Sequence, residues 1–186
     1  MEGPMTDISI HLNALSGRLT QLGRPVVGIL EPGTPDEGVR AVLGEAPDEV
    51  REWFGWCGGT SHAVGQTIDQ ASFIPGYVFP SMREALDVKA EAGNPPSGFL
   101  DWIPVLLSGG YDFYAAAWDG NGNTYVLGVL LGEPVEVEYE SLGEMVSVFT
   151  AAIDRRAFFV DEIGEFSMDP VLFDEVYQST TGRSLG

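Results

Sequence analysis

Cys57 and His62 come nearest to a catalytic pair, a thiol nucleophile with a base five positions further along the chain. Such a pair also needs a third side chain to orient the base, and nothing in the sequence supplies one. We therefore interpret this glycine-rich segment as a loop that follows a helix. One cysteine and two histidines also lack the ligand spacing of a zinc site, and we expect His11 to be a partly exposed residue of an amphipathic helix.

Asp119, Asn121 and Asn123 place side-chain oxygens at alternate positions, as a calcium-binding loop does. However, Thr124 stands where an EF-hand loop needs glycine, and Leu130 stands where it needs a bidentate glutamate. The glycines between the three residues suit the positive φ angles of a hairpin turn. The pattern favours a turn, and with no phosphate-binding glycine motif before a helix we expect neither a metal nor a cofactor.

Acidic and apolar residues alternate from Val135 to Glu140. The period of two in a strand predicts three glutamates on one face and apolar residues on the other, the glutamates being Glu136, Glu138 and Glu140. Carboxylates roughly 7 Å apart on one face repel each other, so the pattern adds nothing to folding. It is either a solvated face that protects a sheet edge or a docking surface for a basic partner. A second acidic surface is predicted at 36–52, where several acids begin helices.

The chain is strongly acidic, with 28 Asp and Glu against nine Lys and Arg and a formal net charge of −19. Nucleic acid and anionic membranes repel such a chain, because binding either one needs clustered basic side chains. Basic proteins attract it, and the attraction accelerates their encounter. The alternative is that the charge serves only solubility or suits a salty cytoplasm.

Several features favour the cytoplasm. Cys57 is the only cysteine, so no intramolecular disulfide can form. The first residues, Met-Glu-Gly-Pro, contain no basic region before an apolar run, and no stretch approaches 18 apolar residues. We therefore expect neither a signal peptide nor a membrane span.

Two kinds of pattern predict the fold. Apolar spacing and capping residues predict helices near 6–22, 34–43, 47–56, 81–90, 141–153 and 169–176, with a short strand at 26–30 and another at 157–160. The predicted caps of the last three helices are Ser81 with Glu84, Ser141 with Glu144, and Asp169. Four short β-rich runs separated by glycine-containing turns predict an antiparallel meander at 102–107, 111–118, 124–130 and 135–139. Helices, then a meander, then helices are typical of a single α+β domain. The helix in residues 1–25 is expected as an amphipathic extension, packed on the core of the domain or at a dimer seam.

Several segments between Glu52 and Asp161 resemble the SUKH superfamily, which groups bacterial toxin-immunity proteins with fungal cell-wall assembly regulators. They are Trp-Phe-Gly-Trp-Cys-Gly-Gly at 53–59, Ile-Pro-Gly-Tyr at 74–77, Trp-Ile-Pro-Val at 102–105 and Gly-Gly-Tyr-Asp-Phe-Tyr at 109–114. A strand, a turn, a second strand and a helix ending near Ile153 follow in the same order.

In that family, a tryptophan-x-proline strand precedes a glycine-rich turn with an aspartate, and the next strand ends in a second acid. Trp102 and Pro104, Asp112, and Asp119 take these places here. The family turn usually has glycine directly before the aspartate, whereas this chain has Tyr111. We assign Trp102, Pro104 and the helical Trp53 to the structural core.

The resemblance implies that residues 26–186 form a SUKH-like domain that binds and blocks a secreted toxin, often a nuclease, and that Asp112 and Asp119 contribute to binding. A nuclease that grips phosphates carries a basic surface, which an acidic inhibitor complements. We therefore expect a non-enzymatic, cytoplasmic immunity protein with a basic toxin domain as its partner. The alternatives are a cytosolic scaffold or regulatory module without a toxin partner, and an enzyme working through paired carboxylates, whose sign would be a pocket where two acids with shifted pKa values converge.

Overall fold

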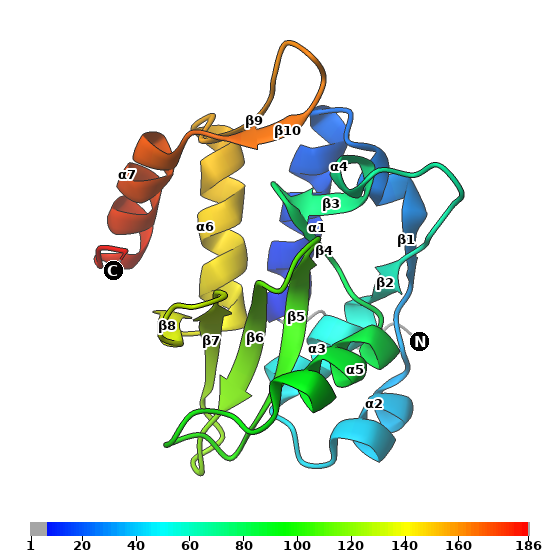
Figure 1. Cartoon of the computed structure of the whole chain (residues 1–186), viewed down its shortest axis with the longest axis vertical. Coiled ribbons are helices and arrows are strands. Elements are labelled where there is room, and N and C mark those ends of the chain that lie inside the picture. The colour runs from blue at the N-terminus through cyan, green and yellow to red at the C-terminus, as the bar shows by residue number, and fades with distance from the viewer. Residues whose placement is uncertain (1–6, 186) are drawn as a thin grey trace.

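A six-stranded antiparallel sheet forms the centre of the computed structural model, which describes residues 7–185 (Figure 1). Its strands follow one another in chain order. They are β3 (Ser72–Ile74), β4 (Tyr77–Val78), β5 (Asp101–Ser108), β6 (Phe113–Trp118), β7 (Thr124–Val129) and β8 (Glu136–Tyr139). The meander predicted from the sequence is therefore confirmed, and two short strands, β3 and β4, extend it at one edge.

One face of the sheet packs against α6 (Leu142–Asp154) and α1 (Asp7–Gln21), which run side by side in Figure 1. Ser141 begins α6 by accepting a hydrogen bond from the backbone NH of Glu144, as the sequence predicts. The apolar stripe of α1 is buried in the main hydrophobic cluster of the domain, through Ile8, Leu12, Leu15 and Leu19. The helix thus packs on the core of the domain, which is the first of the two placements expected from the sequence. The division of the chain at residue 25 stays a prediction.

The other face of the sheet is covered by α5 (Met82–Ala92) and by the chain that follows it. Ser81 and Glu84 form the reciprocal capping box that the sequence predicts at the start of α5. Trp102 and Pro104 of β5 are buried, and the Trp102 indole NH donates to the Gly93 carbonyl at 3.0 Å. Their assignment to the core is confirmed.

A layer of short elements closes one side of the domain. It contains a 3₁₀ helix (Pro25–Ile29), α2 (Asp36–Leu43), α3 (Asp48–Trp56), α4 (Ile68–Ala71), and the two-stranded sheet of β1 (Leu30–Pro32) and β2 (Cys57–Thr60). The strand predicted at 26–30 is wrong, because Pro25 lacks an NH and, at the first position of a helical turn, favours that turn over a strand. Trp53 of α3 is fully buried, which confirms its place in the core.

The C-terminal part of the chain lies against the outer side of α6. Strands β9 (Phe158–Val160) and β10 (Phe166–Met168) form a hairpin, and α7 (Pro170–Thr181) follows. Asp169 begins α7 by accepting a hydrogen bond from the NH of Leu172, in the capping role that the sequence predicts. In Figure 1, α7 lies beside α6 on the side away from α1.

Candidate binding pocket

The thiol and the imidazole of the sequence motif do not form a pair. Cys57 is buried, its sulfur hydrogen-bonds within β2 to the backbone of Gly59, and burial raises the pKa of the thiol to about 11. His62 is exposed and contacts Glu84 at 2.9 Å. A buried thiol with a raised pKa is a poor nucleophile, so this segment does not support catalysis.

The predicted turn at Asp119 is confirmed. Its carboxylate accepts hydrogen bonds from the NH groups of Asn121 and Asn123, at 2.8 and 3.0 Å, and from the Asn123 side-chain amide. The hydrogen bond from the Asn123 side chain is the main reason that the pKa of Asp119 is lowered. Within residues 7–185, no group of three or more His, Cys, Asp or Glu side chains is placed to hold a metal ion.

Asp112 joins two neighbouring turns of the meander. It accepts a hydrogen bond from the NH of Leu131, at 2.9 Å, and so connects the β5–β6 turn to the β7–β8 turn. Tyr111, which directly precedes Asp112, is exposed. Asp112 and Asp119 therefore stabilise turns of this chain, and their use in partner binding stays a prediction.

The glutamate ladder predicted on the last strand of the meander is wrong, because a β-bulge interrupts the alternation. Val126 pairs with Tyr139 and the next residue, Leu127, pairs with Val137, which leaves Glu138 as the extra residue. A bulge redirects side chains, so Glu138 turns towards the helices together with the buried Tyr139. Val137 points outward instead, with 49% of its surface exposed.

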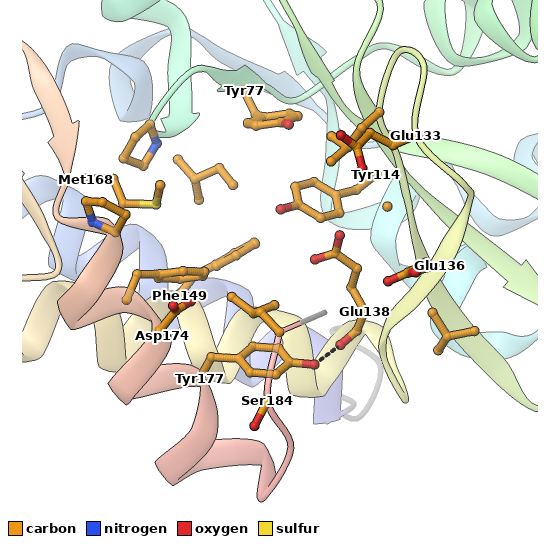
Figure 2. A pocket seen from close by; sticks show the side chains of 18 of the residues that line it. Tyr77, Tyr114, Glu133, Glu136, Glu138, Phe149, Met168, Asp174, Tyr177 and Ser184 are labelled. Atoms are coloured by element: carbon orange, nitrogen blue, oxygen red, sulfur yellow. Dashed lines mark hydrogen bonds between the residues drawn. The ribbon is translucent and has the colours of Figure 1, made fainter.

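The redirected Glu138 lies in a pocket of about 570 Å³ between the sheet and the C-terminal elements (Figure 2). The sheet contributes Tyr77, Tyr114 and the segment from the β7–β8 turn into β8, and the opposite wall comes from α6, β9, β10 and α7. Apolar and aromatic side chains form most of the lining, among them Ile74, Phe149, Phe158, Phe173 and Tyr177. Four acids also contribute to it, namely Glu133, Glu136, Glu138 and Asp174.

The Glu138 carboxylate fits this position because it lies over Gly128 of β7, which is the register partner of Glu136 and has no side chain. A Cβ atom added to Gly128 would come within 2.1 Å of the carboxylate oxygen, so a side chain there would displace Glu138. Within residues 7–185, the carboxylate has no hydrogen-bond or ion-pair partner. Burial, and then the charge of Glu136, raises its pKa above the ordinary value for glutamate.

Two tyrosine hydroxyls lie near Glu138. Figure 2 shows that the Tyr114 hydroxyl and the Glu138 carboxylate both point into the pocket, while the Tyr177 hydroxyl donates to the Glu138 backbone carbonyl. The hydroxyls of Tyr114 and Tyr139 are close enough to perturb each other's pKa. The Tyr139 hydroxyl is nevertheless buried without a hydrogen-bond partner among the described residues. Burial raises the pKa of both tyrosines, so neither is ionised at neutral pH.

The third predicted glutamate has a different environment. Glu140 is exposed and lies 3.3 Å from Arg183, whose guanidinium also binds Glu144 at 2.5 Å. Two acids of the second predicted surface, Asp36 and Asp48, are likewise paired, since Arg51 contacts both of them. The pocket therefore holds a half-buried carboxylate, that of Glu138, without a cation.

The basic side chains of the protein are largely engaged in its own ion pairs. Seven of the nine contact an acid within residues 7–185, namely Arg18, Arg24, Arg40, Arg51, Lys89, Arg155 and Arg183. The excess negative charge therefore faces solvent with few cations to balance it.

Within residues 7–185, no helix has the length and apolar character that crossing a membrane requires.

A pocket of this kind is not visible in the sequence. The position of the Glu138 carboxylate in the pocket depends on a bulge and on Gly128, and only the alternation of acids gave a signal at this strand. A scan against protein-family models gives no match, and a search of curated proteins gives none either.

Proposed function

We propose that the protein is a non-enzymatic binding module for a basic protein, and that it acts as an immunity protein that neutralises a toxin domain in the cytoplasm. The single observation that carries the proposal is the unpaired Glu138 carboxylate, half-buried in an aromatic pocket. Burying a charge without a partner costs folding free energy, and such a cost persists where the charge is used for binding.

The surroundings of the pocket fit a protein partner. Exposed apolar side chains lie beside its acids, among them Leu131, Val135 and Val137. An apolar patch edged by charge is typical of a protein interface. The net charge of −19 would steer a basic domain towards it. The SUKH resemblance supports the immunity role independently of these contacts.

A second candidate is an enzyme that uses Glu136 and Glu138 as its carboxylate pair, because both line the pocket and Glu138 has a raised pKa. Glu136 is exposed, however, so the pocket desolvates only one of the two carboxyl groups. Binding is therefore the function that the geometry supports better. Turnover of a chromogenic glycoside or ester that is lost in Glu138→Gln would favour the enzyme instead.

The proposal is tested by isolating the partner with two baits in parallel, the wild type and a variant with Glu133, Glu136 and Glu138 changed to Gln. A control variant, with the exposed Glu45, Glu91 and Glu162 changed to Gln, loses the same charge away from the pocket. We expect a basic partner whose association with the pocket variant is slower by at least about tenfold at low salt. The difference should fade as ionic strength rises and screens the charges.

The isolated partner also decides between the two kinds of binding protein. If it is a toxin domain, its expression should stop the growth of a bacterial host, and co-expression of this chain should restore growth. A non-toxic partner would favour the scaffold. Equal association rates for the wild type and both variants at low salt would contradict the docking of a basic partner at the pocket.

A further inference from the structure

We propose that the pocket receives the side chain of one arginine from the partner, with its guanidinium between the Tyr114 ring and the Glu138 carboxylate. This inference rests on the proposed function and deepens it, because it names the chemical group that the site recognises. The charge of the pocket, the geometry of its rings and two arginines of the chain itself support it.

The negative charge of the pocket favours a cation as its ligand. The Glu138 carboxylate has no hydrogen-bond or ion-pair partner among residues 7–185, and Glu133, Glu136 and Asp174 add negative charge around the same space. A neutral or apolar occupant would displace water from the Glu138 carboxylate without replacing the lost hydrogen bonds. This loss would cost binding free energy. A guanidinium replaces that water with charge-assisted hydrogen bonds.

The aromatic lining favours a planar cation. The rings of Tyr77 and Tyr114 are 5.1 Å apart between centroids and inclined at 45°, so they form two sides of a wedge above Glu138. Phe149 and Tyr177 lie on the opposite wall. A guanidinium stacks on such rings while its edge donates to a carboxylate, whereas a lysine ammonium is compact and strongly hydrated.

The chain holds two of its own arginines by the same combination of ring and carboxylate. Arg24 lies 4.8 Å from the centroid of the Phe166 ring and 3.0 Å from Asp69. Arg183 lies 5.9 Å from the centroid of the Tyr177 ring, at the border of the pocket, and binds Glu144. Tyr114 and Glu138 offer the same combination of an aromatic ring and a carboxylate. The guanidinium that binds between them would come from another molecule.

The test is an NMR titration of the full chain with N-acetyl-arginine amide, followed by the amide signals of Gly128 and of β8. The control ligands are N-acetyl-citrulline amide, a neutral analogue of the same shape, and N-acetyl-lysine amide. We expect saturable shifts with the arginine probe, with a dissociation constant in the range of about 1–10 mM, typical of a single side chain. The citrulline and lysine probes should bind at least about tenfold more weakly.

Two variants locate the site. Glu138→Gln should abolish the saturable shifts, whereas Glu162→Gln, which removes an exposed charge elsewhere, should leave them unchanged. Absence of saturable shifts up to about 50 mM probe would overturn the inference. Equal binding of the citrulline probe would overturn the role of charge, and equal binding of the lysine probe would overturn the choice of a guanidinium.

The outcomes separate this inference from the proposed function. A basic partner that binds wild type and Glu138→Gln equally, together with a silent arginine probe, would overturn the arginine pocket and leave the partner in place. Binding of the arginine probe without any basic partner would support the pocket and contradict the proposed function.

Discussion

Replacement of Glu138 by glutamine should raise the melting temperature at pH 7 while weakening partner binding. Burial raises the pKa of Glu138 in the folded state, so ionising it costs more in the folded protein than in the unfolded chain. The stability that a raised pKa contributes is present at low pH, where the group is protonated, and is lost as pH rises through the folded-state pKa. Glutamine is neutral throughout and avoids that loss.

The gain in stability of Glu138→Gln over the wild type should therefore be largest at neutral pH and shrink as pH falls below the pKa of Glu138. Thermal unfolding from pH 4 to pH 8 measures it, and a gain of 1 kcal/mol corresponds to roughly 2–4 °C in a chain of this size. Glu162→Gln removes one exposed charge and controls for the general relief of repulsion. If Glu138→Gln is less stable than Glu162→Gln at pH 7, the carboxylate contributes to folding and the argument from its burial fails.

Replacement of Trp53 by alanine should destabilise the protein by about 3–5 kcal/mol, as the removal of a large aromatic side chain from a core does. Trp53 is fully buried and stacks on Phe79, with 4.7 Å between the ring centroids and 11° between the ring planes. Urea unfolding followed by circular dichroism measures the change, and the slope of the transition should stay the same.

Trp53→Phe is the matched control for this change. The indole nitrogen of Trp53 is buried without a hydrogen-bond partner among the described residues, so phenylalanine removes no hydrogen bond and keeps an aromatic ring against Phe79. It should cost less than about 1.5 kcal/mol. A cost for Trp53→Ala below about 1 kcal/mol would show that this side chain is not an anchor of the core.

The sequence predicted those parts of the fold that depend on local signals. The capping residues Ser81, Ser141 and Asp169 each begin the helix expected of them, because a cap acts within one turn. The four strands from 101 to 139 were predictable because each is a run of β-forming residues between turn residues. Strands β3 and β4 were missed, since segments of three and two residues are too short to show a period.

The candidate site could not be predicted in the same way. The alternation around Glu138 follows a period of two only if the strand pairs without interruption, and the bulge at Glu138 is set by its pairing with β7. The importance of Gly128 likewise appears only when β7 and β8 lie side by side. The sequence identified the acidic strand as a possible docking surface, and the tertiary pairing determines that one of its acids enters a pocket.

The most direct test of the account is a map of where the basic partner touches the protein, obtained by hydrogen–deuterium exchange of the purified pair. We predict slower exchange on binding in residues 130–139, which form the β7–β8 turn and β8, and in α7. Residues 36–52, whose acids Asp36 and Asp48 are already paired with arginines, should exchange as in the free protein. Protection confined to residues 36–52, with 130–139 unchanged, would contradict the account.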